Sequence, residues 1–429
     1  MPSLSDQQIH NLLAEFLTFA VVAWGLYLLL RWLRRSRGEL SIGAPVAAAL
    51  AVRVIAAFGV SSSGVAATLR GGDEAGFFAV SKYIASTPFF SHPWRDALTG
   101  KLFEFLFAGQ IWALGSPETV IRITQAGIAV FGLVLLAAAV YELAGPRAAV
   151  LSAWLLALEP TNIFFSTLLH KEPNMLLAAG LVAFAGANMW KRAEFRYLWL
   201  ISLGCLIAVA TRPYAGWFLI AAGAAITLHV GIRSRTETGR SFTLIAIVVL
   251  LVAITAPTVL KASTHGSLTS LQQSQNANAS SSANLRLEAV DFSTRGAIIV
   301  NLPQRISDVL TKPYPWQVAN VSQQFGLLGT IFAWTFFWLV IRELWRARGK
   351  IMDRAGPFVY TGFFLLVAYS LSAGNAGTAF RYRTHVVALA ICLFAVLRQR
   401  RLDSAEEPAP GRQPAEREPA ALEPSPAAA

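Results

Sequence analysis

The sequence is short of charged residues. Only 14% of its 429 residues are Asp, Glu, Lys or Arg, whereas 55% are hydrophobic. Soluble domains carry about 25% charged residues, so water is not the main solvent of this chain. Short alternating strands are lacking too, because the apolar runs are long and rich in Leu, Ala, Val and Phe. The runs therefore predict membrane-spanning α-helices and not a membrane β-barrel.

Cysteine is scarce as well. Cys205 and Cys392 both fall inside apolar runs, which predicts packing residues and excludes a disulfide framework or a thiolate metal site. No two histidines share a metal-binding spacing, so no protein-built metal site is expected. The sequence requires no cofactor, although a divalent cation held by Asp73 or Glu74 together with a substrate phosphate stays open.

No Lys or Arg precedes the first apolar run, which therefore lacks the basic region of a signal peptide and is expected to be retained. A bilayer core needs about 20 apolar residues per helix. The fold class expected is an all-α polytopic membrane protein with ten or eleven transmembrane helices. The predicted spans are 12–32, 41–60, 117–141, 147–165, 173–190, 197–211, 214–231, 241–260, 323–341, 357–373 and 384–397.

Basic residues mark one side of the predicted membrane. If the spans alternate, 19 of the 36 basic residues fall in one set of short connections, which the positive-inside rule places in the cytoplasm. The N-terminus is then outside and the C-terminus inside, in the plasma (inner) membrane. The net charge of +12 is explained by this clustering, and a nucleic-acid partner is not expected. The clusters are Arg31 to Arg37, Arg147, Lys191 to Arg196, Arg233 to Arg240, Arg342 to Arg354 and Arg398 to Arg401.

Both long connections, 61–116 and 261–322, fall on the predicted external side. In the first, apolar residues from Phe77 to Ile84 and from Leu102 to Phe107 predict two helices lying in the membrane interface. In the second, a Ser, Asn and Gln-rich tract at 263–284 is expected to be mobile. Three parts follow: an N-terminal helix with its basic turn at 1–40, a main transmembrane part at 41–402, and a disordered cytoplasmic tail at 403–429.

Four cations stand against the charge bias, in short connections of the predicted external side. They are Lys171 in HKEP, Arg212 in TRPY, and Arg381 and Arg383 in FRYR. Lipid headgroups could be the anionic partner of each one singly. Four on the same side favour a shared phosphate site, since fixed cations stabilise a phosphate leaving group.

Carboxylates on the same side supply the other half of a reaction. Asp73 and Glu74 follow two glycines in GGDEAGFF, where Asp73 could instead be an ordinary helix N-cap with Glu74 in the first turn. Glu159 and Glu172, next to His170, are accessory candidates. Arg53 lies in the middle of a span and needs a partner, expected to be a structural ion pair. The remaining external carboxylates are expected to be solvated: Asp96, Glu104, Glu118, Glu288, Asp291 and Asp308.

With these motifs placed, the chain resembles the polyprenyl-phosphate-sugar-dependent membrane glycosyltransferases of the GT-C fold, which include protein O-mannosyltransferases and aminoarabinose transferases. Members keep an acidic pair in the first large external loop, here Asp73 and Glu74. They also have a charged external turn, here HKEP, and a basic motif before the last helix, here RYR. The chain departs from the pattern in having Phe77 and Phe78 where members often have a Tyr, and one extra span before the acidic loop.

The resemblance implies transfer of a sugar from a polyprenyl-phosphate donor to a hydroxyl of a glycan, lipid or protein, with inversion, on the external face. Asp73 would be the general base, with Glu74 assisting it. Three rival functions remain: a lipid-linked polysaccharide polymerase or ligase that depends on the arginines and not on Asp73, a transporter or flippase, and a non-catalytic scaffold. Transporters place polar residues near the midplane in related halves, whereas here only Arg53 lies at that depth. The residues implied to hold the donor phosphate are Lys171, Arg212, Arg381 and Arg383.

Overall fold

A computed structural model describes residues 5–62, 72–115, 117–234, 237–259, 269, 271–273, 276, 287–318, 321–347, 349 and 351–406. The predicted mobile tract at 263–284 lies largely outside these residues. The helices are α1 (Asp6–Ser36), α2 (Gly43–Ser62), α4 (Gly72–Ser86), α5 (His92–Gly100), α6 (Leu102–Leu114), α7 (Glu118–Leu158), α8 (Pro160–Phe165), α9 (Glu172–Arg192), α10 (Leu198–Thr211), α11 (Pro213–Arg233), α12 (Glu237–Val259), α14 (Arg295–Thr311), α15 (Val321–Arg346), α16 (Ile351–Ser372) and α17 (Ala376–Glu406).

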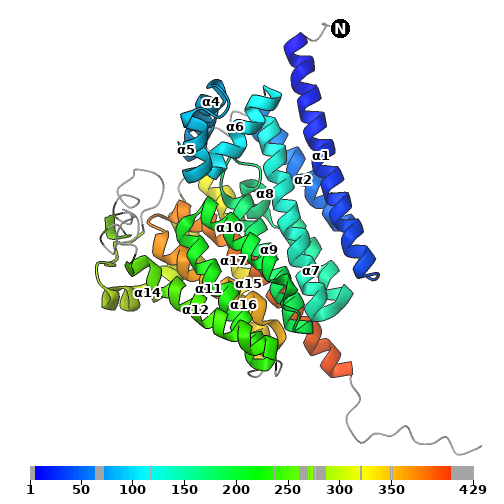
Figure 1. The fold of residues 1–429 in the computed structure, drawn as a ribbon, viewed down its shortest axis with the longest axis vertical. Coiled ribbons are helices and arrows are strands. Elements are labelled where there is room, and N and C mark those ends of the chain that lie inside the picture. The colour runs from blue at the N-terminus through cyan, green and yellow to red at the C-terminus, as the bar shows by residue number, and fades with distance from the viewer. Residues whose placement is uncertain are drawn as a thin grey trace, which may run out of the picture.

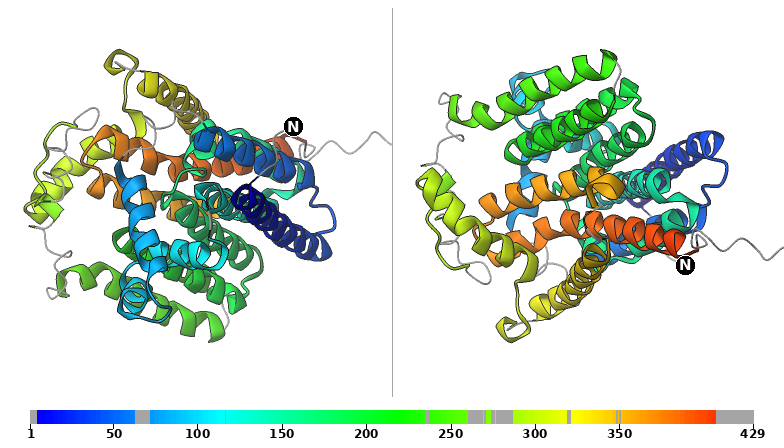
Figure 2. Two further views of the ribbon diagram at one scale, coloured as in Figure 1. Left: turned by 90° about the horizontal axis from the view of Figure 1, so that it is seen from above. Right: turned by 90° about the horizontal axis from the view of Figure 1, so that it is seen from below.

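The prediction of an all-α chain of membrane-length helices is confirmed for the described residues. Seven of the helices are long and apolar enough to cross a bilayer: α1, α2, α7, α11, α15 from Gly326, α16 and α17. Three further predicted spans form as the helices α9, α10 and α12. Figure 1 shows α4, α5 and α6 gathered at one end of the bundle, while the C-terminal end of α17 lies at the opposite end. From above and below, α1 and α2 lie along one edge of the other helices (Figure 2).

Helix α7 consists of two helical halves that fold back on each other, as the two predicted spans 117–141 and 147–165 require. The break is at Gly145, whose φ of 81° is a conformation that glycine adopts without a steric penalty, and Pro146 follows it. The Arg122 guanidinium donates to the carbonyl of Thr167 at 2.9 Å, although both residues are more than 20 positions from the break. The chain must therefore reverse at Gly145.

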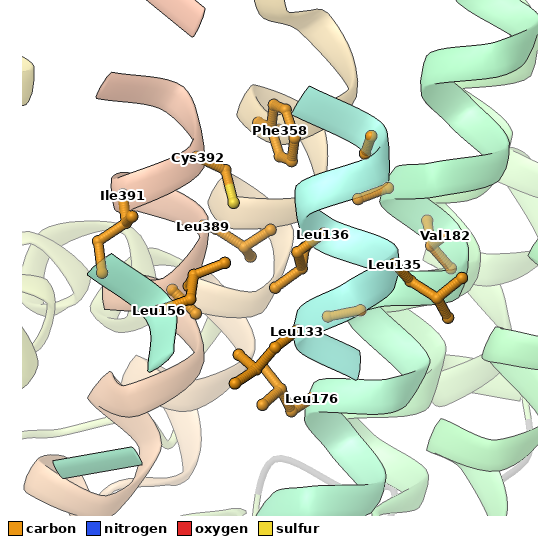
Figure 3. Packing of buried hydrophobic residues seen from close by; sticks show 14 of the residues in the cluster. Leu133, Leu135, Leu136, Leu156, Leu176, Val182, Phe358, Leu389, Ile391 and Cys392 are labelled. Atoms are coloured by element: carbon orange, nitrogen blue, oxygen red, sulfur yellow. The ribbon is translucent and has the colours of Figure 1, made fainter. Parts of the chain in front are cut away.

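The core lies where the first half of α7 packs between α9 and α17. Leu136 of α7 faces Leu389 and Cys392 of α17, and Val182 of α9 lies on its other side (Figure 3). The α7 and α9 backbones come unusually close: a Cβ on Gly180 would lie 2.7 Å from the carbonyl oxygen of Gly132. Small residues allow the two backbones to pack closely. In a membrane such close packing has to hold helices together, because the hydrophobic effect does not drive helices together in lipid. Both cysteines are free and buried, as predicted.

The first long loop forms three helices and not the two predicted. The additional helix is α5, which lies between α4 and α6 in the chain. The loop has its own apolar contacts, since Trp94 of α5 is buried against residues of α4 and α6. Glu104 on α6 was expected to be solvated, but it is buried. Its neighbours Phe103 and Phe107 pack against Ile121 of α7, which fixes the loop to the bundle.

Around the second long loop, one expectation is wrong. Asp308 on α14 is buried and paired with Arg305 at 3.3 Å and with Lys312 at 2.9 Å, so it is not a solvated carboxylate. At the other end of the chain, α17 continues to Glu406, three residues past the predicted start of the tail at 403. Residues 407–429 lie outside the described residues.

Arg53 finds its partner in a different form from the expected ion pair. Its guanidinium donates to the carbonyls of Ala49 and Ala157 at 3.1 Å and to the side-chain oxygen of Asn162 at 2.8 Å. The carboxylate of Glu159 instead caps α8, where it accepts from the backbone N–H groups of Thr161 and Asn162. Arg53 therefore ties α2 to the turn between α7 and α8.

Candidate functional site

The candidate site lies at the end of the bundle where α4, α9, α11 and α17 begin. Each of these starts brings one charged side chain: Asp73 in the first turn of α4, Glu172 as the first residue of α9, Arg212 just before Pro213 of α11, and Arg381 near the start of α17. We call these four residues the charge cluster. They come from four segments up to 308 residues apart in the chain.

Glu172 is the centre of the charge cluster. Its Oε1 accepts from Nη2 of Arg212 at 2.6 Å and lies 3.0 Å from Nε of Arg381. The side chains of Glu172 and Arg212 are only 4% and 6% exposed, so one carboxylate compensates two cations with little help from water. Within the described part of the chain, Oε2 of Glu172 and Nη1 of Arg212 are buried without a hydrogen-bond partner. The two carboxylates and two arginines of the cluster balance in formal charge, but Oε2 of Glu172 and Nη1 of Arg212 keep unused hydrogen-bonding capacity.

Asp73 is the exposed member of the charge cluster. Its Oδ2 accepts from Nη1 of Arg381 at 3.1 Å, and its side chain is 63% exposed. Arg381 therefore bridges the buried Glu172 and the exposed Asp73. This places a carboxylate that solvent can reach next to a buried cationic centre.

Glu74 points away from Asp73 and has another partner. It is buried and forms an ion pair with Arg122 of α7, which also pairs with Glu118 at 2.9 Å. The sequence pattern did not single out Arg122, which stands four residues after Glu118 at the start of an apolar run. Because Glu118 pairs with Arg122, it is not the free solvated carboxylate that was expected. The Glu74 and Arg122 pair fixes the first turn of α4 on α7, which sets the position of the adjacent Asp73.

A shell of aromatic residues surrounds the buried side of the cluster, and no pattern in the sequence predicted it. The Arg212 guanidinium lies 4.5 Å from the ring centre of Tyr382, whose hydroxyl accepts from that of Tyr214 at 2.7 Å. His385 lies between the hydroxyl of Tyr369, at 3.0 Å from Nδ1, and the backbone carbonyl of Glu172, at 2.9 Å from Nε2. Because a carbonyl only accepts, Nε2 carries the proton, and Nδ1 accepts from Tyr369.

His170 and Lys171 adjoin the cluster. Burial lowers the pKa of His170 to about 4, so its ring is neutral near pH 7, and its Nδ1 has no hydrogen-bond partner within the described residues. Partial burial also lowers the pKa of Lys171 from its ordinary value. The Lys171 ammonium lies 5.1 Å from the ring centre of Phe77 and 5.9 Å from that of Phe103. Phe77 therefore contacts a cation at the position where a phenol was expected from the resemblance.

Arg383 is not part of the charge cluster. It is buried, and it donates to the carbonyls of Leu310 and Lys312 at 3.1 and 3.0 Å and to the hydroxyl of Thr330 at 2.7 Å. Glu159 is committed to the α8 cap. Of the predicted site residues, the structure therefore brings Asp73, Glu172, Arg212 and Arg381 together, with His170 and Lys171 beside them, and directs Glu74, Glu159 and Arg383 to structural contacts.

No three His, Cys, Asp or Glu side chains gather at metal-ligand distance among the described residues. His92 pairs instead with Asp96 at 2.8 Å on the surface of α5. Asp73 and Glu74 each face an arginine, so a divalent cation would have to compete with Arg381 or Arg122.

Comparisons with known proteins complete the description. No protein-family model matches the sequence, and no curated protein matches it. Among solved structures, the chain is similar to the archaeal oligosaccharyltransferase AglB from Archaeoglobus fulgidus, solved with an inhibitory peptide and a dolichol-phosphate. The superposition has a TM-score of 0.45 at 13% sequence identity and covers 85% of this chain. It covers 52% of the archaeal protein, so the chain spans about half of that length.

Proposed function

We propose that the protein is a membrane glycosyltransferase that moves a sugar from a polyprenyl-phosphate donor to a hydroxyl acceptor, with inversion, on the external side of the membrane. The observation that carries the proposal is the charge cluster: an exposed carboxylate, Asp73, is held beside the partly buried Arg381, which Glu172 joins to the buried Arg212, at one end of a bundle of membrane-length helices. These are the two kinds of group that sugar transfer from a phosphate requires.

In this reaction the acceptor oxygen forms a bond to the anomeric carbon while the bond from that carbon to the phosphate oxygen breaks. Asp73 takes the acceptor proton, because its carboxylate is the one in the cluster that solvent and an incoming hydroxyl can reach. The electron pair of the broken bond stays on the phosphate, whose added charge is stabilised by Arg212 and Arg381. The ammonium group of Lys171, which adjoins the cluster, adds to the positive electrostatic potential at the phosphate.

Glu172 has a different part in this proposal. Its single carboxylate keeps Arg212 and Arg381 adjacent in spite of their repulsion, and it leaves Nη1 of Arg212 without a partner among the described residues. A donor phosphate supplies the acceptor that this Nη1 lacks, and Lys171 beside the cluster supplies a further cation for its charge. Glu172 is therefore a positioning residue for the arginines and not the base.

The experiment is a transfer assay on the purified full chain with polyprenyl-phosphate-linked sugars. Asp73→Asn should abolish transfer while membrane insertion and donor binding persist, because the amide keeps the size of the side chain but cannot accept the proton. Glu288→Gln, which changes an exposed carboxylate on the second loop, is the matched control and should stay active. A fully active Asp73→Asn protein would remove Asp73 from this role, and labelling of the Asp73 segment from the cytosol would contradict the external site.

The polymerase or ligase alternative has one observation in its favour. Asp73 already accepts a hydrogen bond from Arg381 at 3.1 Å, so an acceptor hydroxyl would have to compete with that guanidinium for the carboxylate. In that alternative the reaction requires the arginines and not Asp73. Asp73→Ala would then retain transfer, while Arg212→Ala and Arg381→Ala would lose it. In the proposed function, all three variants lose transfer.

A further inference from the structure

A hollow lies on the surface of α15 at the end of the bundle far from the charge cluster. It encloses about 530 Å³ and is lined by Trp338, Ile341, Arg342, Trp345 and Arg346. We call it the α15 hollow. None of these residues takes part in the proposed reaction, so the hollow needs a separate explanation.

The depth of the α15 hollow places it at a membrane surface. Glu343, between its lining residues, accepts from Arg401 of α17 at 2.9 Å, so the two helices are in register there. Arg401 follows Arg381 of the charge cluster by 20 residues on the same helix, which is about 30 Å at 1.5 Å per residue. This is roughly the thickness of the hydrocarbon core, so the hollow and the charge cluster lie at opposite faces of the membrane.

The hollow carries more positive charge than its carboxylate can compensate. Glu343 is 1% exposed and lies 3.3 Å from Arg342, 3.4 Å from Arg346 and 2.9 Å from Arg401. Three cations thus share one anion. Arg342 and Arg346 are 37% and 48% exposed and are therefore available to another anion from outside the chain.

The aromatic residues indicate where that anion comes from. Trp338 and Trp345 are 58% and 84% exposed, and the Arg342 guanidinium lies 5.3 Å from the ring centre of Trp338. Exposed tryptophans are enriched at the headgroup level of a bilayer, where an apolar ring meets a polar surface. Beyond the hollow, α15 also exposes the apolar side chains of Leu328 and Ile331. An acyl chain can lie on this surface while its headgroup reaches the arginines.

The same combination recurs on α1. A second hollow is lined by Tyr27, Leu30, Arg31, Arg34 and Arg35. It is at the same end of the bundle, since the neighbouring Arg37 pairs with Glu142 close to the α7 reversal. Among the described residues, no carboxylate forms an ion pair with these three arginines.

We propose that the α15 hollow binds the phosphate headgroup of an acidic phospholipid in the leaflet at this end of the bundle, with Arg342 and Arg346 as ligands and the two tryptophans against the acyl region. The α1 hollow repeats the same chemistry. Basic hollows next to apolar helix faces are where acidic headgroups gather on membrane proteins. This site is independent of the proposed sugar transfer.

The test counts lipids that stay bound to the full chain. The protein is extracted from liposomes of equal parts phosphatidylglycerol and phosphatidylcholine, and retained lipids are measured by native mass spectrometry. At the α15 hollow, Arg342→Gln with Arg346→Gln should lower the ratio of retained phosphatidylglycerol to phosphatidylcholine about fivefold for each arginine, since ~1 kcal/mol per basic residue near the surface corresponds to that factor. Lipid held by the α1 hollow is the same in both proteins and is subtracted as a constant background. The control, Arg196→Gln with Arg240→Gln, removes two exposed arginines outside both hollows and should leave the ratio unchanged.

Each other outcome overturns the proposal. An unchanged ratio, or an equal fall in the control, would show that the hollow is not a site. Binding of millimolar inorganic phosphate without any preference for phosphatidylglycerol over phosphatidylcholine would show that the arginines bind free phosphate and not a lipid. If the double variant fails to fold, Arg346→Gln alone, whose side chain is half exposed, gives the same comparison at a fivefold change.

Discussion

Replacing Glu172 by Gln tests the charge cluster most directly. The substitution keeps the shape of the side chain and removes the one charge that Arg212 and Arg381 share at 2.6 and 3.0 Å. Breaking a buried ion pair costs about 3–5 kcal/mol, because it leaves a buried charge uncompensated. We expect the lower end, about 3 kcal/mol, since Arg381 keeps Asp73 and the amide oxygen still accepts from Arg212.

The same variant reports whether the arginines accept phosphate. Without Glu172, an added phosphate is the remaining anion for Arg212, so phosphate should raise the melting temperature of Glu172→Gln more than that of the unchanged protein. At a hundredfold excess over Kd, binding to the folded state returns about 2.7 kcal/mol, close to what was lost. The assay is thermal unfolding in detergent followed by tryptophan fluorescence, with inorganic phosphate or polyprenyl phosphate against chloride.

Glu39→Gln is the matched control for this experiment, because Glu39 is an exposed carboxylate at the other end of the bundle. It should change neither the melting temperature nor the response to phosphate. If Glu172→Gln melts like the unchanged protein, the cluster does not hold the bundle together as described. If it is destabilised but phosphate has no larger effect on it, the arginines are structural and the proposed function loses its support.

Three further predictions concern the surroundings of the site. Arg122→Ala should destabilise the protein by about 3–5 kcal/mol, because Glu74 loses its buried partner, and proteolysis of the α4 to α6 loop should become faster. The pKa of His170 is lowered to about 4, below its ordinary value of about 6.5, so the free energy of unfolding decreases as the pH falls from about 6.5 toward 4 and is about 2 kcal/mol lower at pH 5. His170→Asn should therefore reduce the difference between the melting temperatures at pH 7 and pH 5. An unchanged difference would refute the assignment. Gly180→Ala should cost about 1–3 kcal/mol, because its Cβ would lie 2.7 Å from the Gly132 carbonyl, whereas Gly76→Ala, with open space around it, should cost less.

Hydrophobicity and charge bias were enough to predict the helices and their order. The basic connections, and the cations Arg212 and Arg381 on the opposite side, are recognised from residues that are close together in the chain, so the sequence shows them directly. That HKEP, TRPY and FRYR reach one end of the bundle follows from the alternation of spans. The structure adds their contact through Glu172.

The division of labour between adjacent residues could not be predicted. Asp73 and Glu74 are neighbours, yet one faces Arg381 of α17 and the other Arg122 of α7, because successive residues of a helix point about 100° apart. Which face of α4 meets which helix depends on packing between segments separated by 48 and 308 residues. Arg122 itself was read as part of an apolar span, although Glu118 one turn earlier was a signal that it has an ionic partner.

The two arginines of the RYR motif lie on opposite sides of α17, because two residues advance a helix by about 200°. Arg381 holds the first long loop through Asp73, and Arg383 holds the end of α14 through the carbonyls of Leu310 and Lys312. A rotation of this helix end by one residue would release both loops at once. The opening turns of α17 therefore connect the two long loops mechanically, because one rigid helix end carries a contact to each of them.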